Sequence, residues 1–369
     1  MPNLTRDIFV RDAIDVDVAF VGRFISSLVK AETLAPSVLF CMFNYLSLFA
    51  YESYARLKIL DPSTARGMSF TPGMLDLLER SRHSLKLFED THRGVSGQLD
   101  FFADKVAPAH RRAFIDPVRL PFASAWKADL GLTRYEDQLI TSTFATTFTL
   151  GYPPEKLFLD GTGETLKNIS QEYGRYFRHL GAVPDPTAQS FVSAMDVSGI
   201  ANQNVRSVVQ YGNGFNGKTT PTINMLLSTF RGLINTCDQL LGLDTSEASR
   251  QTIFKLRYLT VYQVLRSLSI LKDEKTRVLT SRSRQYIDGL LADPDAILIV
   301  DPAKKPLRNT LMHYGLDTRI DLTGLTRGRP LYGIVEQVFQ LDFEEMEQRL
   351  AKLTGRIAGE LNTWATQKV

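Results

Sequence analysis

The sequence is organised around the stretch PLRNTLMHYG, residues 306–315. Pro306 suits the first turn of a helix, where a backbone N–H has no partner, and Gly315 suits a left-handed residue just past the helix end. The stretch therefore predicts a short helix that contains Arg308 and His313. An imidazole transfers protons near neutral pH, and a guanidinium stabilises negative charge that develops on phosphate oxygens. The pair indicates cleavage of RNA.

The spacing of these two side chains sets a geometric condition on the site. At about 100° per residue, an offset of five residues places Arg308 and His313 about 140° apart on an ideal helix. Either a distorted helix start brings Arg308 round to His313, or a second copy of the segment completes the site across a two-fold axis. The second alternative predicts a homodimer.

The pattern Arg308-Asn309-x-x-x-His313-Tyr-Gly resembles the signature of the HEPN superfamily (higher-eukaryote and prokaryote nucleotide-binding domains), in which His follows Arg at a short spacing. The resemblance implies an up-and-down helical bundle that dimerises. In active members it implies an endoribonuclease that needs neither metal nor cofactor, because the 2′-hydroxyl of the RNA attacks the adjacent phosphate. Arg308 would stabilise the phosphorane, His313 would act as general base or acid, and Asn309 would orient or hydrogen-bond.

The resemblance also carries expectations about partners. A ribonuclease of this class is expected to be of toxin or antiviral-defence type, to take RNA as its substrate, and to be held inactive by an antitoxin or another regulatory protein. An alternative interpretation of the motif is structural. Arg308 would then pair with a carboxylate such as Asp317 or Asp321, His313 would be a hydrogen-bonded structural residue, and the bundle would be a non-catalytic binding or dimerisation module.

A second stretch, GNGFNGKT at residues 212–219, matches the phosphate-binding loop pattern G-x-x-x-x-G-K-[ST]. Gly212 and Gly217 would let backbone N–H groups wrap phosphates, Lys218 would reach the outer phosphates, and Thr219 would bind magnesium. The stretch makes a P-loop-like nucleotide-binding protein an alternative function.

This alternative requires a strand that precedes the loop, for which residues 207–211 are the candidate, and a Walker B strand that ends in an acidic residue, which residues 296–301 resemble. Pro221 follows soon after the lysine, and residues 222–274 have the period of long helices instead of alternating strands and helices. We therefore interpret the glycines as part of a Gly/Asn-rich linker at residues 201–221.

The composition is that of a folded protein. Of 369 residues, 44% are hydrophobic and 22% are charged, and the formal net charge is only +3. Cys41 and Cys237 are the only cysteines, too few for a disulfide framework, which favours a reducing cytosol. The most apolar stretch, residues 38–51, falls short of the ~20 residues needed to cross a bilayer. We expect a cytoplasmic protein that makes no use of a membrane.

Helical periodicity dominates both ends of the chain and predicts an all-α fold. Successive amphipathic patterns start near residue 8, at Pro36 and at Thr71-Pro72, whereas residues 135–149 suit either a helix or a strand. We expect a helical domain of unassigned role over 1–200, the linker over 201–221, and a HEPN-like up-and-down helical bundle over 222–369.

Overall fold

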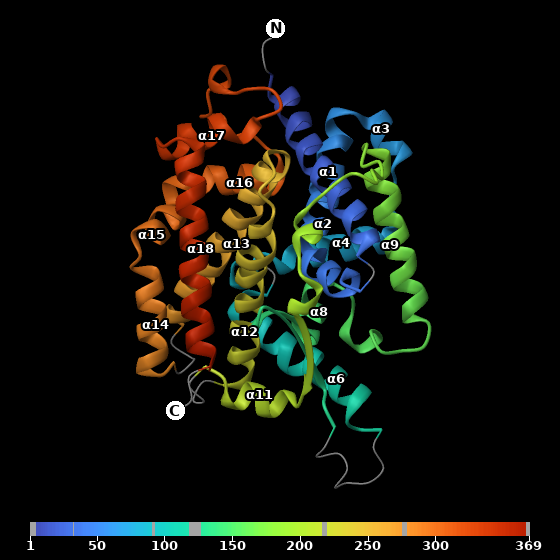
Figure 1. Cartoon of the computed structure of the whole chain (residues 1–369), viewed down its shortest axis with the longest axis vertical. Helices are drawn as coiled ribbons and strands as arrows, with labels where there is room; N and C mark the ends of the chain where they lie inside the picture. Colours follow the sequence, from blue (N-terminus) through green and yellow to red (C-terminus); the bar gives the residue numbers. More distant parts are fainter. Residues whose placement is uncertain are drawn as a thin grey trace.

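The computed structural model describes residues 5–31, 33–90, 93–117, 127–215, 220–274 and 279–366. The chain is predominantly helical and carries one small three-stranded sheet, so the predicted all-α class is confirmed. Long helices run side by side along the longest axis of the molecule (Figure 1). Within the described residues, no helix combines the length and the apolar character that are needed to span a bilayer.

The elements of the first half, in chain order, are α1 (Arg6–Lys30), α2 (Ala35–Leu60), α3 (Pro62–Gly67), α4 (Pro72–Ser84), a 3-10 helix (Leu87–Glu89), α5 (Gly94–Asp100), a π-helix (Phe101–Val106), α6 (Ala107–Phe114), β1 (Leu130–Tyr135), β2 (Gln138–Ser142), α8 (Thr143–Thr149), α9 (Thr162–His179) and α10 (Phe191–Ala194). Those of the second half are β3 (Ile200–Val205), α11 (Ser207–Asn213), α12 (Pro221–Asn235), α13 (Glu247–Asp273), α14 (Ser281–Leu291), α15 (Pro294–Val300), α16 (Lys305–His313), α17 (Pro330–Phe339) and α18 (Phe343–Thr366).

Several helix starts follow from local signals in the sequence. The Thr71 hydroxyl accepts a hydrogen bond from the N–H of Met74, and Pro72 occupies the first turn of α4, as the Thr-Pro pair predicts. Thr5 caps α1 in the same way by accepting from the N–H of Ile8. Each cap satisfies one of the backbone donors that a helix start leaves without a partner.

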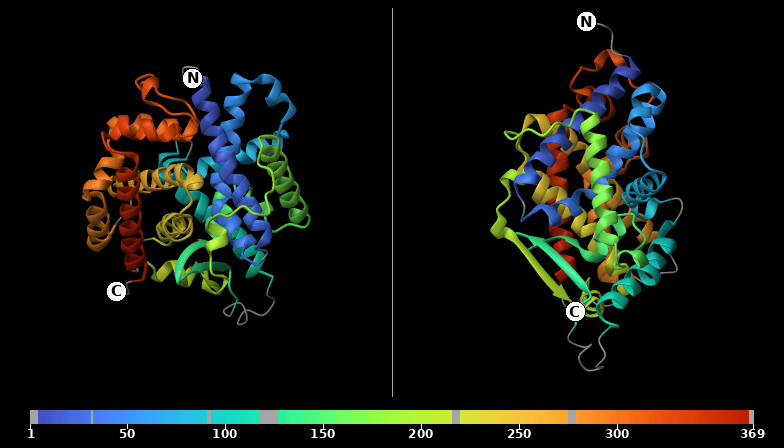
Figure 2. Two further views of the ribbon diagram at one scale, coloured as in Figure 1. Left: turned by 45° about the horizontal axis from the view of Figure 1, so that its top comes forward. Right: turned by 90° about the vertical axis from the view of Figure 1, so that its right-hand side faces the viewer.

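The sheet has the order β2-β1-β3, and both pairings are antiparallel (Figure 2). β1 and β2 form a hairpin whose turn residues, Glu136 and Asp137, have φ of 47° and 62°. The stretch 135–149, which suited either a helix or a strand, contains both: it ends β1, forms β2 and continues as α8. The predicted linker 201–221 also has regular structure, because β3 and α11 fill most of it.

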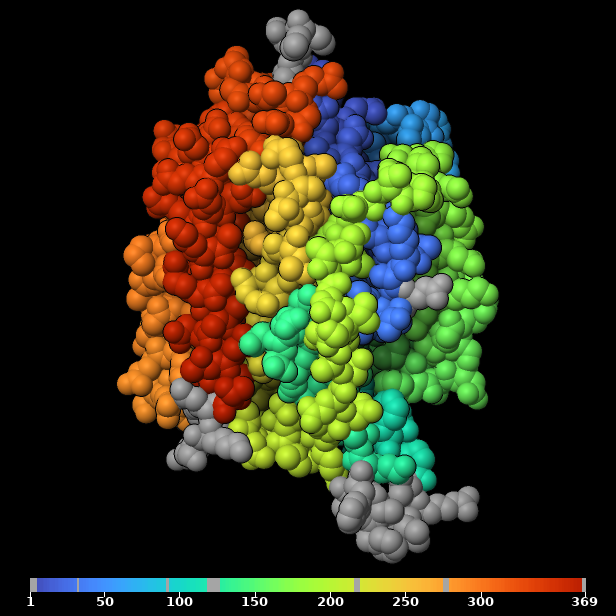
Figure 3. Space-filling view, in the orientation of Figure 1, coloured from blue at the N-terminus to red at the C-terminus, as the bar shows by residue number. Residues whose placement is uncertain are grey.

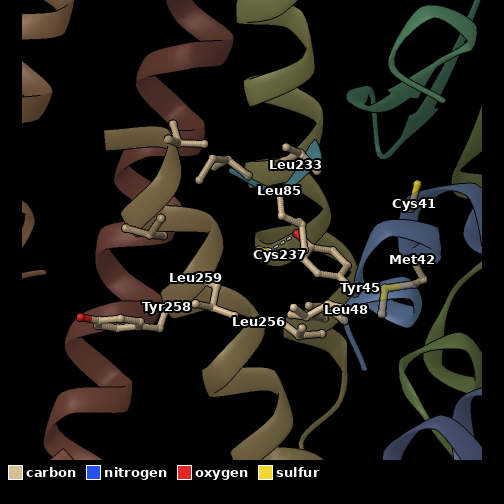
Figure 4. Close-up of a cluster of buried hydrophobic side chains, with 14 of the residues drawn as sticks. Cys41, Met42, Tyr45, Leu48, Leu85, Leu233, Cys237, Leu256, Tyr258 and Leu259 are labelled. Carbon is tan, nitrogen blue, oxygen red and sulfur yellow. Dashed lines mark hydrogen bonds between the residues drawn. The ribbon is translucent and has the colours of Figure 1, made fainter. Parts of the chain in front are cut away.

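One cluster of buried apolar side chains extends from Phe9 in α1 to Trp364 in α18. Its centre joins the two ends of the chain: the Tyr45 hydroxyl of α2 lies 2.7 Å from Thr260 Oγ1 and 3.6 Å from the sulfur of Cys237 (Figure 4). The space-filling view shows the two ends of the chain meeting at the surface as well, where α1 in blue lies against the orange-red segment of α17 (Figure 3). The predicted boundary at 201–221 therefore does not coincide with a break in the core.

Two helices organise the second half around this core. α13 packs against α1, α12, α16 and α18 and forms the centre of the molecule. α12 packs on β2, where the amide of Asn235 donates to the carbonyl of Leu139 at 2.9 Å. The approach is close because α12 has a glycine at the contact: a Cβ on Gly232 would lie 3.0 Å from the carbonyl oxygen of Ile140.

We predict that Gly232→Val lowers the free energy of unfolding by about 1–3 kcal/mol more than Gly174→Val does, because only the first change forces side-chain atoms against β2. Gly174, in α9, faces open space and is the matched control for helix propensity and for β-branching. Urea denaturation of the two variants and the wild type measures the difference. Equal destabilisation would show that α12 and β2 do not approach as closely as described.

Candidate catalytic site around helix α16

Helix α16 begins and ends close to the residues that its sequence indicates. Pro306 lies in its first turn, as predicted. The left-handed residue after the helix is Tyr314, with φ 51° and ψ 17°, so the prediction that Gly315 takes this conformation is wrong. Gly315 leaves room for Arg56 instead, because a Cβ there would meet Nη2 of Arg56 and the guanidinium would have to shift. That arginine donates from Nε to the carbonyl of His313 at 2.6 Å and so binds the free end of the helix.

A buried ion pair holds Tyr314 in place. Its hydroxyl donates to Oδ2 of Asp17 at 2.6 Å, and the same oxygen lies 2.6 Å from Nζ of Lys255. Thr252 donates to the other carboxylate oxygen at 2.8 Å, and the ammonium of Lys255 lies 3.9 Å from the centre of the Tyr314 ring. Burial lowers the pKa of Lys255, an effect that the charge of Asp17 opposes, and burial raises the pKa of Tyr314 well above its ordinary value. The network fastens α16 to α1 and α13.

His313 is paired with a carboxylate from the first half of the chain. Its Nδ1 lies 3.0 Å from Oε2 of Glu52, in α2. Because a carboxylate only accepts hydrogen bonds, the proton of this pair sits on Nδ1, which leaves Nε2 able to accept another proton. The side chain of His313 is 35% exposed and that of Glu52 is 6% exposed. A polar substrate can therefore reach the imidazole, whereas the carboxylate stays behind it.

Glu52 is itself held by a second partner. Its other oxygen accepts from Nη1 of Arg82, in α4, whose guanidinium lies 4.6 Å from the centre of the Tyr51 ring. Burial raises the pKa of Glu52, but the hydrogen bond from His313 and the charge of Arg82 outweigh burial, so that the pKa is lower than usual. Glu52 is thus a fixed anion at neutral pH, able to orient the imidazole and to stabilise its protonated form.

Arg308 faces a different set of partners. Its Nη2 lies 3.8 Å from Oε2 of Glu89, and its guanidinium carbon lies 5.8 Å from the centre of the Tyr262 ring. With the Gln263 amide oriented so that its oxygen faces Arg308, that oxygen accepts from Nη2 at 2.7 Å. Asn309 is exposed, and its Oδ1 accepts from Nη1 of Arg308 at 3.2 Å. Only 11% of the Arg308 side chain is exposed.

The carboxylate beside Arg308 is Glu89, and not Asp317 or Asp321, which the structural interpretation of the motif predicted. Asp317 forms an ion pair with Arg319 at 2.9 Å, and Asp321 caps a 3-10 turn by accepting from the N–H of Thr323 at 2.9 Å. Both are tied within their own loop. Glu89 takes the place next to Arg308 because the short 3-10 helix after α4 packs directly against α13.

Lys86 connects the environments of His313 and Arg308. Burial lowers the pKa of this lysine, and the charges of Arg82 and Arg308 lower it further, whereas Asp90 and Glu52 raise it. The ammonium is therefore within electrostatic range of Arg308 and of Glu52, the carboxylate that pairs with His313. Within the described residues, no carboxylate lies within 4.0 Å of it. A half-buried ammonium that forms no close ion pair among the described residues, and that lies within electrostatic range of Arg308, is a favourable place for a phosphate.

The structure thus brings His313 and Arg308 to one charged region without direct contact between them. Arg308 engages Glu89 and Gln263, while His313 engages Glu52, in agreement with the offset expected from their spacing on the helix. The partners of both motif residues come largely from α2 and from the chain around α4. Sequence reasoning assigned no role to those segments.

One of the site residues that the sequence analysis did not identify, Glu52, has a local signal in the sequence. Glu52 is the only acidic residue in α2, a helix otherwise rich in large apolar side chains. Glu is almost never buried unless it is paired, so a single Glu among such neighbours indicates a buried carboxylate with a cationic partner. The identity of the partner has no local signal, because Arg82 and His313 lie far along the chain.

Only part of the P-loop-like stretch, residues 212–219, lies within the described residues. Gly212 lies inside α11, and Gly217, Lys218 and Thr219 lie outside the described residues. The two segments that a nucleotide-binding sheet requires as strands are helices: residues 207–213 form α11 and residues 294–300 form α15. The flanking structure of a P-loop is therefore absent from both stretches. Among the described residues, no three His, Cys, Asp or Glu side chains are grouped so that they could hold a metal ion.

Comparison of the chain with protein-family models, with curated proteins and with solved structures finds no match.

We predict that Lys255→Met destabilises the fold by about 3–5 kcal/mol, because it leaves Asp17 as an uncompensated charge in the interior. The double variant Asp17→Asn, Lys255→Met removes both charges and is expected to recover much of this loss. Chemical denaturation of the two variants measures the difference. If the double variant is no more stable than Lys255→Met, the ion pair is not the interaction that fixes α16.

A second prediction concerns His110, whose side chain is 1% exposed and hydrogen-bonded to the carbonyl of Asp129 and to Thr147. Burial lowers its pKa from 6.5 to about 4. Between these values the unfolded chain binds a proton that the folded chain does not, so the free energy of unfolding falls as the pH falls, by about 3 kcal/mol over the whole window.

Denaturation from pH 7 to pH 4 is expected to show a flatter profile in His110→Gln than in the wild type. His179→Gln, at an exposed histidine, is the matched control and should keep the wild-type slope. An unchanged slope in His110→Gln would mean that this imidazole is not buried in its neutral form.

Proposed function

We propose that the chain is a metal-independent endoribonuclease in which His313 transfers the proton and Arg308 and Lys86 bind the phosphate. The observation that carries this proposal is the ion-pair contact of 3.0 Å between Nδ1 of His313 and Oε2 of Glu52, which leaves Nε2 of a partly exposed imidazole as a proton acceptor. The resemblance of residues 306–315 to the HEPN signature supports the same chemistry.

In the proposed reaction, Nε2 of His313 takes the proton from the 2′-hydroxyl, and the 2′-oxygen forms a bond to the adjacent phosphorus. The bond from phosphorus to the 5′-oxygen breaks, the leaving oxygen takes up a proton from water, and the imidazolium of His313 returns its proton to the solvent. The products are a 2′,3′-cyclic phosphate and a 5′-hydroxyl. Glu52 stabilises the imidazolium that forms, as a buried carboxylate does when it is hydrogen-bonded to a catalytic histidine.

Arg308 stabilises the negative charge of the phosphorane together with Lys86. Its contact with Glu89, at 3.8 Å, is a loose ion pair, and a phosphate oxygen that replaces it gives the guanidinium a shorter partner. Asn309 donates or accepts a hydrogen bond at the exposed edge of the same helix.

The wider setting is also proposed from the resemblance. It comprises an RNA substrate, a homodimer, a cytoplasmic location, a role as a toxin or in antiviral defence, and an antitoxin or regulatory protein that restrains the enzyme. One chain supplies the anionic partners of both motif residues, and the homodimer would bring the two copies of the motif together across the two-fold axis.

A second candidate function is a non-catalytic HEPN-type binding or dimerisation module. The low exposure of Arg308, 11%, and its contacts with Glu89 and Gln263 favour this alternative, because they are what a structural arginine shows. The two candidates differ in whether RNA is cut.

We predict that the protein cleaves a mixed RNA pool in the presence of EDTA and leaves 2′,3′-cyclic phosphate ends. His313→Ala and Arg308→Ala are each expected to reduce the rate by at least about 100-fold. Glu52→Gln should give a partial loss, because it weakens the orientation of the imidazole without removing it. His179→Ala, at an exposed histidine, is the control and should cleave as the wild type does.

Electrophoresis and mass analysis of the RNA ends report the outcome, and thermal unfolding of each variant excludes loss of the fold. Cleavage that persists in His313→Ala, or that stops in EDTA, would contradict the mechanism. RNA binding without cleavage, in preparations freed of bound protein partners, would favour the binding module.

A further inference from the structure

A cavity of about 500 Å³ lies beside the candidate site, between α4, α5, the π-helix that follows it, and the loop after α8. Its volume is in the range of small-molecule sites, about 300–1,000 Å³. The side chains that matter for its chemistry are Arg80, Arg93, Gln98, Phe101, Lys105 and Tyr152. None of them belongs to the motif around α16.

Two cations that line this cavity form no close ion pair among the described residues. The guanidinium carbon of Arg93 lies 4.1 Å from the centre of the Phe101 ring, and burial lowers the pKa of this arginine, an effect that the charge of Asp90 opposes. Lys105 is exposed at the same cavity. In the described part of the chain neither group has a carboxylate within 4.0 Å, whereas Arg80 is paired with Asp76 at 2.6 Å. A half-buried guanidinium and an ammonium on one cavity wall match an anion such as a phosphate.

The cavity also has a buried acceptor without a donor. Gln98 is 1% exposed, and its amide nitrogen donates to the carbonyl of Leu87 at 3.2 Å and to Asp90 at 3.4 Å. Its Oε1 has no hydrogen-bond partner among the described residues. A buried acceptor left without a partner is unfavourable, so an N–H group of a ligand would be stabilised there. Tyr152, which is half-buried, supplies an aromatic surface for a flat ring.

Acidic residues on the wall limit how much negative charge the ligand can carry. Asp76 is neutralised by Arg80, and Asp90 interacts with His83. Glu79 and Glu155 also line the cavity. Two free cations balance a single phosphate, whereas the additional phosphates of a nucleoside triphosphate would face these carboxylates.

A chain of contacts connects the cavity with His313. Asp90, on the wall, lies 3.5 Å from Nδ1 of His83, whose Nε2 lies 2.9 Å from Nη2 of Arg82. Arg82 donates to Glu52, and Oε2 of Glu52 lies 3.0 Å from Nδ1 of His313. Asp90 on the cavity wall and the candidate catalytic residue His313 therefore lie at opposite ends of one continuous polar network.

We propose that this cavity binds one nucleoside monophosphate unit, with its phosphate on Arg93 and Lys105 and its base against Tyr152 and Gln98. The unit is either a free nucleotide or a nucleotide of the RNA. The second source rests on the proposed function, whereas binding of a free nucleotide does not. In both cases occupation of the cavity adds groups at one end of the network that orients His313.

The test is isothermal titration calorimetry of the full chain with AMP, with ribose 5-phosphate, and with a short 2′-O-methyl oligoribonucleotide, which cannot be cleaved. Arg93→Gln is expected to weaken binding at least tenfold, and Tyr152→Leu is expected to weaken AMP binding but not ribose 5-phosphate binding. Arg111→Gln, at an arginine whose side chain is 71% exposed on α6, is the matched control and should bind as the wild type does.

AMP binding that Arg93→Gln weakens, with ribose 5-phosphate at least tenfold weaker, supports a free nucleotide as the ligand. Oligoribonucleotide binding that Arg93→Gln weakens, without AMP binding, identifies RNA as the source. Equal affinity for AMP and ribose 5-phosphate overturns the nucleotide assignment, since no ring would then be recognised. If none of the three probes binds, or if the wild type and Arg93→Gln bind them equally, the proposed site is wrong. These results do not depend on whether the protein cuts RNA.

Discussion

The buried contact between Asp17 and Lys255 is the constraint on which the arrangement around α16 depends. Two opposite charges lie in the interior, so each must be neutralised by the other, and the carboxylate completes its hydrogen bonds with Thr252 and Tyr314. Removing any one partner leaves a polar group without its bond in a medium of low polarity. The network therefore fixes α1, α13 and the end of α16 at one relative position. The side chain of His313 takes its direction from that end.

The buried network around Asp17 and Lys255 also explains how the candidate site is built from both halves of the chain. α16 carries His313 and Arg308, but the anions that face them, Glu52 and Glu89, come from α2 and from the turn after α4. α2 contacts α13 through Tyr45 and Thr260 and packs against α16, so the core that stabilises the fold also sets the distance between the imidazole and its carboxylate. Stability and the geometry of the candidate site thus rest on the same packing.

The features that the sequence predicts correctly depend on residues close together in the chain, and the features that it misses depend on contacts between distant segments. The all-α class, the Thr71 cap and the place of Pro306 in the first turn of α16 follow from residues a few positions apart. β3, IANQNV, lacks alternating apolar residues, so it carries no strand signal, and its pairing with β1 decides its conformation. Arg308 and His313 stand out by type and spacing, but their partners depend on tertiary contacts between distant segments, which no local pattern encodes.

The distance along the chain between paired charges also has a consequence for synthesis. Asp17 and Lys255 are 238 residues apart, so at about 5–20 residues per second the ribosome makes the aspartate roughly 10 to 50 seconds before its partner. The interval between the synthesis of Glu52 and that of His313 is longer still. A nascent chain spends this interval beside ribosomal RNA with its imidazole not yet made. If the proposed activity holds, the order of synthesis itself separates the ribosome from a finished ribonuclease centre until the last helices emerge.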